Sequence, residues 1–189
     1  MYLIIEGVDT SGKSTQVELL KKSYSKACFT KEPGGTKLGV KLRELILHKG
    51  VKSHKAELFL FLADRAEHYE SVIKQHKIVI SDRGFISGIA YALANHDDYE
   101  LKFLAKLNSF ALDEKMPDFV VLLETNEQLI KSRLQEKSED LIEKRGIEYL
   151  LKVQTLMKEI LIKLKINHII IDSKLEIDEI HQKIKGFIR

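Results

Sequence analysis

The segment GVDTSGKS, from Gly7 to Ser14, constrains the fold of this chain more than any other. It fits the pattern GxxxxGK[ST], in which glycines let the backbone turn around phosphates, a lysine reaches the β- and γ-phosphates and a hydroxyl binds Mg²⁺. This loop requires a strand before it and a helix after it, and the apolar run YLII and the stretch from residue 13 supply both. The predicted phosphate-binding residues are Gly7, Val8, Asp9, Thr10, Ser11, Gly12, Lys13, Ser14 and Thr15, with Ser14 on the metal.

Short apolar runs alternate with long amphipathic stretches along the chain, which is typical of βα units wound into a parallel sheet. The runs that begin at 119 and 168 are apolar at nearly every residue and predict strands buried on both faces. The predicted fold is therefore α/β, a three-layer P-loop NTPase fold with a five-stranded parallel sheet surrounded by helices, plus a short lid. The expected strands are Tyr2–Ile5, Ala27–Thr30, Ile78–Ser81, Phe119–Leu123 and His168–Ile171. The expected helices are 13–24, 36–49, 54–75, 85–95, 97–113, 126–136, 139–165 and 175–187, with Asp97, Asn126 and Ser138 as N-terminal caps.

Composition limits the number of domains and the kinds of partner. A chain of 189 residues, 44% hydrophobic and 31% charged, with no Pro- or Gly-rich linker, predicts a single domain over 1–189. The net charge of +3 without a clustered basic stripe argues against a nucleic-acid partner. The single Cys28 excludes an internal disulfide, and the apolar runs are too short to span a bilayer. We therefore expect a cytoplasmic protein without a membrane or nucleic-acid partner.

The second substrate must be inferred from other residues, because GTPases, motor ATPases and small-molecule kinases share this phosphate-binding loop. A guanine-specific NKxD segment is missing, which argues against a GTPase. Four cations, Lys31, Arg43, Arg65 and Arg83, follow predicted strand ends or lie on the next predicted helices. Since ligands of open α/β sheets bind at the carboxyl ends of the strands, these cations could hold an anionic acceptor. Taken singly, each is also explained as a solvated surface charge.

Four motifs, in order along the chain, resemble those of bacterial thymidylate kinases. Residues 6–13 match the family's EGxD loop, and KEPGGT at 31–36 is similar to REPGGT. LFLADRAEH at 60–68 matches LFxAxRxEH, and DRGFISGIAY at 82–91 matches DRxxxSxxAY. The resemblance implies transfer of the γ-phosphoryl group of ATP to thymidine monophosphate (dTMP), for dTTP biosynthesis, with Mg²⁺. It also implies a homodimer packed through apolar helices such as the one expected at 54–75.

Asp9 is unexpected in a loop that surrounds phosphates. A carboxylate about 6 Å from a triphosphate is repelled by several kcal/mol at an effective dielectric of about 20, so it should not face the donor. The resemblance implies that Asp9 accepts a hydrogen bond from the 3′-hydroxyl of the acceptor sugar. A solvent-facing residue in a tolerant loop position is the alternative.

The resemblance also assigns the rest of the acceptor site. Phe61 would stack on the thymine ring and Arg65 would hydrogen-bond a base carbonyl, since both side chains suit planar bases. Arg43 and Arg83 would hold the acceptor phosphate. The remaining substrate-binding residues are Glu32, Pro33, Ser87 and Tyr91, with Tyr91 crowding the 2′ side of the sugar, and Asp82 would contact Mg²⁺ through water. Alternatively, Phe61 is a core residue of an apolar helix, and Asp82 and Arg83 form a structural ion pair or a turn.

The predicted reaction needs no general base, because a phosphate monoester with a second pKa near 6 is already a nucleophilic dianion at neutral pH. Catalysis then depends on alignment and on charge neutralisation, for which Lys13, Asp9, Arg83 and Arg133 are the candidates. Arg133 belongs to a predicted lid at 132–145, where Lys137 and Arg145 are weaker candidates and a charged solvent face is the alternative. The residues Lys31, Gly84 and Ala92 depart from the family pattern and predict weaker selection of thymine.

Two other functions remain open from the sequence. A kinase for another nucleotide or for a deoxynucleoside shares the fold, and a nucleoside hydroxyl would need a base such as Asp9. A P-loop regulatory ATPase would hydrolyse ATP without a small acceptor and respond to a macromolecular partner.

Overall fold

The computed structural model describes residues 1–96, 98–134 and 146–188. Within them, five parallel strands form one sheet in the order β2-β3-β1-β4-β5. The strands are β1 (Tyr2–Glu6), β2 (Cys28–Lys31), β3 (Val79–Asp82), β4 (Phe119–Glu124) and β5 (His168–Asp172). The five-stranded parallel sheet predicted from the sequence is confirmed.

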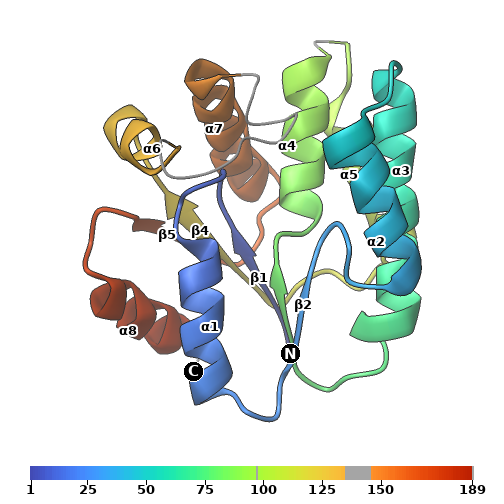
Figure 1. Ribbon diagram of the computed structural model, residues 1–189. Coiled ribbons are helices and arrows are strands. Elements are labelled where there is room, and N and C mark those ends of the chain that lie inside the picture. Colours follow the sequence, from blue (N-terminus) through green and yellow to red (C-terminus); the bar gives the residue numbers. More distant parts are fainter. Residues whose placement is uncertain (97, 135–145, 189) are drawn as a thin grey trace.

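The helices surround this sheet (Figure 1). They are α1 (Lys13–Ser23), α2 (Lys37–Glu44), α3 (His54–His68), α4 (Phe85–Asn95), α5 (Leu101–Ala111), α6 (Glu127–Leu134), α7 (Ile147–Lys163) and α8 (Ile177–Phe187). Two π-helical segments, η1 (Leu45–Lys49) and η2 (Tyr69–Ile73), continue α2 and α3. The helices predicted at 36–49 and 54–75 are therefore each divided in two. None of the described helices has the length and apolar character needed to cross a membrane.

The helix predicted at 97–113 starts later than expected, at Leu101. The rings of His96 and Tyr99 pack with centroids 4.8 Å apart, and the backbone is still extended at Glu100, so the helix forms only after this contact. The predicted cap Asn126 is confirmed, because its Oδ1 accepts a hydrogen bond from Leu129 N at 2.9 Å. The caps at 97 and 138 and most of the predicted lid lie outside the described residues.

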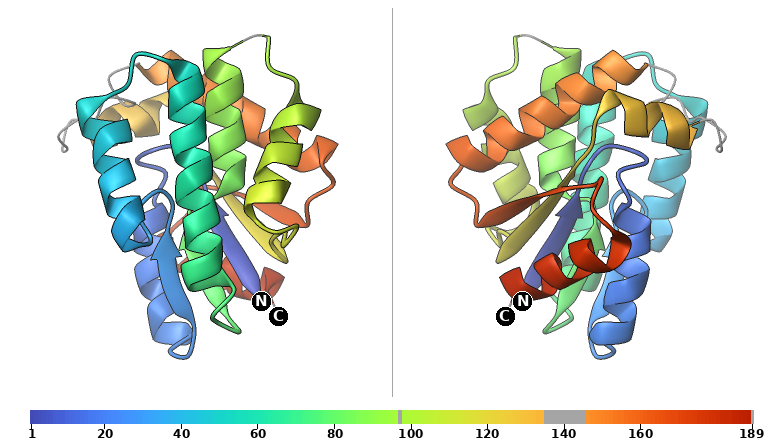
Figure 2. Two further views of the ribbon diagram at one scale, coloured as in Figure 1. Left: turned by 90° about the vertical axis from the view of Figure 1, so that its right-hand side faces the viewer. Right: turned by 90° about the vertical axis from the view of Figure 1, so that its left-hand side faces the viewer.

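Helices cover both faces of the sheet, and alternate residues of the central strand β1 pack into two separate cores. Helices α1 and α8 cover one face, and α4 and α7 cover the other (Figures 1 and 2). Leu3 and Ile5 belong to the core under α1 and α8, whereas Tyr2 and Ile4 belong to the core with α4 and α7. This burial on both faces is typical of a central parallel strand.

Burial on both faces was also predicted for the strands at 119 and 168. In β4, residues 120–123 are fully buried as expected. In β5 the prediction is wrong, because His168, Ile169 and Ile170 are only half-buried. The reason is that β5 lies at an edge of the sheet, where a strand has a neighbour on one side only.

The strand order locates the ligand crevice. From β1 the chain first forms β2 and β3 on one side and then crosses to β4 and β5 on the other. Ligands of open α/β sheets bind at the carboxyl ends of the strands where the order reverses in this way. The ends of β1 and β3, where Ile5 is paired with Asp82, therefore position the site.

Candidate functional site

The loop between β1 and α1 turns back on itself through two glycines. Gly7 and Gly12 have φ of 148° and 92°, values that residues with a side chain rarely adopt. A Cβ on Gly7 would also lie 2.8 Å from the backbone oxygen of Leu123. The loop leads directly into α1 at Lys13, so the predicted strand, phosphate loop and helix are all present.

Lys13 is buried inside this loop, with 6% of its surface exposed. Its Nζ donates a 2.8 Å hydrogen bond to Val8 O. Burial, and to a smaller extent the positive charge of Arg83, lowers the pKa of Lys13 from 10.5 to about 8. An incoming triphosphate would favour the charged form and hold the proton on Lys13.

Ser14 and Asp82 form the pair suited to a cation. Ser14 Oγ, at the start of α1, lies 3.5 Å from Asp82 Oδ2, at the end of β3. Asp82 Oδ1 is buried and has no hydrogen-bond partner among the described residues. Carboxylate and hydroxyl oxygens are the ligands that Mg²⁺ prefers, and a buried carboxylate oxygen without a donor suits a metal-bound water. These residues therefore fit Mg²⁺.

Asp9 is paired with Arg83, and this pair connects the phosphate loop to the start of α4. Arg83 Nη2 donates to Asp9 Oδ1 at 2.7 Å, and Nη1 donates to Gly7 O at 2.7 Å. Burial alone would lower the pKa of Arg83, but Asp9 and the nearby acidic groups raise it above its ordinary value. The alternative for Asp82 and Arg83 was a structural ion pair or a turn; Arg83 does form an ion pair, but with Asp9, and its φ of 70° places it in a turn conformation.

Arg133, the one predicted lid arginine in the described residues, lies against the phosphate loop. Its Nη1 donates a 2.7 Å hydrogen bond to Thr10 O, and the side chain is half-buried. Arg133 is therefore not part of a fully solvated helix face, which was the alternative for this residue. The other two candidates, at 137 and 145, lie outside the described residues.

One cavity surrounds the phosphate loop and extends toward the last strand. It has a volume of about 460 Å³ and is lined by loop residues 9–15, by Arg133 and by a segment after β5. The sequence reasoning missed this last segment, which contributes Ser173, Leu175 and Ile177. Its position after the predicted strand at 168–171 was the available signal, because the carboxyl ends of all parallel strands meet at one edge.

A second cavity lies beside the first, between the phosphate loop and helices α2, α3 and α4. All nine predicted substrate-binding residues line it: Asp9, Glu32, Pro33, Arg43, Phe61, Arg65, Arg83, Ser87 and Tyr91. Leu47, Gly84 and Gly88 complete its walls. Phe61 also packs against the core, so the two interpretations of this residue are compatible.

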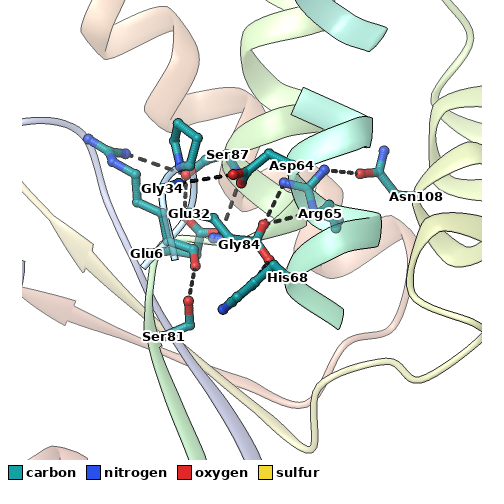
Figure 3. A network of polar contacts seen from close by, with 12 residues as sticks. Glu6, Glu32, Gly34, Asp64, Arg65, His68, Ser81, Gly84, Ser87 and Asn108 are labelled. Carbon is teal, nitrogen blue, oxygen red and sulfur yellow. Dashed lines mark hydrogen bonds and ion pairs between the residues drawn. The ribbon is translucent and has the colours of Figure 1, made fainter. Parts of the chain in front are cut away.

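Arg65 lies in a buried polar network at one side of this second cavity (Figure 3). Its Nε and Nη2 each lie 2.9 Å from Glu32 Oε2, and its Nη1 donates to Asn108 Oδ1 at 2.5 Å. His68 Nδ1 lies 2.7 Å from the other oxygen of Glu32. Arg65 is therefore not a solvated surface charge. The sequence reasoning gave no role to Asn108 or His68.

Glu6, the first residue of the EGxD match, is a second buried acid, and the sequence pattern assigned it no role. Its Oε1 accepts hydrogen bonds from Gly84 N at 3.0 Å and Ser87 N at 3.1 Å, and its Oε2 accepts one from Ser87 Oγ (Figure 3). Burial raises the pKa of Glu6 from 4.5 to about 7, although these hydrogen bonds and the charge of Arg83 oppose the rise. Glu6 thus holds the first turn of α4 against the end of β1.

Comparisons with known proteins point to one family. A family model described as thymidylate kinase matches residues 5–184. A thymidylate kinase of Campylobacter concisus is 51% identical over 100% of this chain and 98% of its own length. One from Sulfurovum sp. is 50% identical over the full length of both chains. The crystal structure of thymidylate kinase from Ehrlichia chaffeensis, 26% identical, superposes with a TM-score of 0.77 and covers 100% of this chain and 98% of that one.

Proposed function

The chain belongs to the thymidylate kinase family, and from that membership we propose how its residues transfer a phosphoryl group from ATP to dTMP. The reaction yields ADP and dTDP and is a step in dTTP synthesis. The family assignment favours this activity over the two alternatives that the sequence left open, a kinase for another nucleotide or a deoxynucleoside and a P-loop regulatory ATPase.

The observation that carries the proposal is that the two cavities share residues. Asp9, Glu32, Arg43 and Arg83 line both of them. ATP occupies the cavity around the phosphate loop and dTMP occupies the second one. Their phosphates then meet at the shared wall, where Arg43 and Arg83 supply positive charge for the acceptor phosphate.

Charge neutralisation in the transition state falls to Lys13, Arg83 and Arg133. Lys13 contacts the β- and γ-phosphates, and Arg133 reaches the transferring group from the side of Thr10 O, which its Nη1 contacts at 2.7 Å. The acceptor phosphate attacks as a dianion, so no residue is needed to take a proton from it. Catalysis depends on alignment and on these three cations.

Ser14 and Asp82 would hold Mg²⁺ together with the donor phosphates. When bound, the ion neutralises charge on the β- and γ-phosphate oxygens. The assignment is supported by Asp82 Oδ1, which is buried and has no donor among the residues that the structure describes.

Asp9 has two roles in this proposal. It holds Arg83 through the 2.7 Å contact, and its carboxylate accepts a hydrogen bond from the 3′-hydroxyl of dTMP. On the base side, Phe61 stacks on thymine, Arg65 donates to a base carbonyl and Tyr91 crowds the 2′ position of a ribonucleotide.

A comparison of dTMP with its 3′-deoxy analogue separates the two roles of Asp9. Asp9→Asn is expected to raise the KM for dTMP, and by much less for the analogue, which has no hydroxyl to contact. An equal rise in KM for dTMP and for the analogue would show that Asp9 acts only through Arg83. Glu44→Gln provides the control, because Glu44 is an exposed carboxylate on α2 that lines neither cavity.

We also propose that the chain acts as a cytoplasmic homodimer, as one kinase domain with a lid at about 132–145. The neighbouring helices α3 and α5 carry Phe59, Phe103 and Phe110 with 61%, 54% and 85% of their surfaces exposed, which supports an apolar contact with a second copy. Sedimentation equilibrium of Phe110→Asp tests this contact. A mass unchanged from that of the wild-type dimer would contradict it.

A further inference from the structure

The guanidinium of Arg65 is held by neighbours on two sides, although it lies at the wall of the second cavity, which we call the acceptor cavity because it is assigned to dTMP. Glu32 Oε2 accepts a hydrogen bond from Nε and forms an ion pair with Nη2 at 2.9 Å, and Asn108 Oδ1 accepts a hydrogen bond from Nη1 (Figure 3). A guanidinium has five N–H groups. At least one N–H on each terminal nitrogen therefore has no hydrogen-bond partner in the part of the chain that the structure describes. Because Arg65 lines the second cavity, a ligand bound there could accept from these groups.

Asn108 is itself fixed at both ends. It lies on α5 with no exposed surface, and its Nδ2 donates a 2.7 Å hydrogen bond to Leu104 O, one turn earlier. Because the amide nitrogen is used there, the amide oxygen must face Arg65. A rotation of the amide would place its NH₂ group against the guanidinium and lose both contacts.

His68 holds Glu32 in a comparable way. Its ring is fully buried, with Nδ1 2.7 Å from Glu32 Oε1 and Nε2 2.7 Å from Thr30 Oγ1 on β2. The two oxygens of Glu32 thus have different partners, Arg65 and His68, so the carboxylate cannot rotate without breaking one contact. Burial raises the pKa of Glu32, but Arg65 and His68 outweigh it and hold this pKa below its ordinary value, so the group stays ionised.

We infer that Asn108 and His68 are positioning residues for recognition of the acceptor base: Asn108 holds Arg65 directly, and His68 holds it through Glu32. The inference rests on the proposed contact between Arg65 and a base carbonyl. Neither residue lines the acceptor cavity, so neither touches the substrate. Their effect is to fix the plane of the guanidinium, because donors misplaced by about 1 Å lose much of their effect.

A double-mutant cycle tests this inference. Asn108→Leu and His68→Leu are each made in the wild-type chain and in Arg65→Lys, which keeps a positive charge beside Glu32. In the wild-type chain each should raise the KM for dTMP about tenfold, the loss expected when a hydrogen bond to a charged group is removed. The KM for ATP should change less than twofold. In the Arg65→Lys chain the same substitutions should change the KM for dTMP less than twofold, since they act through Arg65.

The matched control is Gln154→Leu. Gln154 is a buried amide like Asn108, but it bonds to the backbone of Thr125 at 2.8 and 2.9 Å, and neither residue lines the acceptor cavity. The role of Asn108 is structural, and the inference fails, if Asn108→Leu raises the KM for ATP as much as the KM for dTMP, as the control is expected to do. It also fails if Asn108→Leu raises the KM for dTMP equally in the wild-type and Arg65→Lys chains. If Arg65→Lys alone leaves the KM for dTMP unchanged, the proposed base contact fails first. Asn108→Ala replaces Asn108→Leu if the latter does not fold.

Discussion

Replacement of Glu6 by glutamine should stabilise the protein at alkaline pH and much less at acidic pH. The pKa of Glu6 rises from 4.5 to about 7 on folding, chiefly because the carboxyl is buried. The folded state therefore holds this proton more tightly than the unfolded state does. The resulting stabilisation is fully present below pH 4.5 and is lost as the pH rises through 7. A pKa difference of one unit between the folded and unfolded states corresponds to about 1.4 kcal/mol. Ionisation of Glu6 therefore lowers the free energy of unfolding by roughly 3 kcal/mol at pH 8.5.

Glutamine is neutral at every pH and can still accept the hydrogen bonds from Gly84 N and Ser87 N. The stability of Glu6→Gln relative to wild type should thus be higher at pH 8.5 than at pH 5 by roughly 2–3 kcal/mol. For a chain of this size that corresponds to a difference in Tm of about 5–10 °C. Calorimetry of both proteins at the two pH values measures it, with the exposed Glu179→Gln on α8 as control. An equal Tm difference at both pH values would show that Glu6 does not titrate with a raised pKa in the folded protein.

Three further predictions concern activity. Since burial lowers the pKa of Lys13 to about 8, kcat/KM for ATP should decline as the pH rises through about 8, when the free enzyme loses this charge; a pH profile flat to pH 9.5 contradicts it. Arg133→Ala should lower kcat by a factor of about 10³ with little change in the KM for dTMP, because the arginine acts on the transferring group. Steady-state kinetics with an unchanged kcat would show that Arg133 has only a structural role. Gly88→Ala should raise the KM for dTMP several-fold and leave that for ATP unchanged, because a Cβ at Gly88 would lie 3.1 Å from Nη1 and Nη2 of Arg65; steady-state kinetics with unaltered KM values would oppose this.

The sequence predicted most of the sheet and the residues that line the second cavity because their signals are local. The phosphate loop is a continuous motif, and the residues around Arg65 and Arg83 lie in short segments that resemble one family. The structure brings these segments to one cavity beside the loop. What the sequence could not provide was the partner of each charge. The ion pair between Asp9 and Arg83, for example, joins residues that are 74 positions apart in the sequence. A pair at such a separation produces no local sequence pattern.

Other features depend on neighbours that a single sequence does not identify. The strand at 168 has an apolar pattern like that of the strand at 119, yet its position at the sheet edge leaves it half-buried. Asn108 reads as an ordinary polar residue of an amphipathic helix, and only the fold places it beside Arg65. The late start of α5 follows from the ring contact between His96 and Tyr99, which helix propensity does not include.

The most direct test of the central claim is ADP release measured with Mg²⁺-ATP and a panel of acceptors: dTMP, dUMP, the ribonucleotide of thymine, CMP, AMP, GMP and thymidine. We expect rapid turnover with dTMP, weaker turnover with the ribonucleotide because Tyr91 crowds its 2′-hydroxyl, and no turnover with thymidine, which lacks the acceptor phosphate. If no acceptor raises ADP release above slow hydrolysis, or if thymidine is phosphorylated as fast as dTMP, the assignment of the second cavity to a nucleoside monophosphate is contradicted.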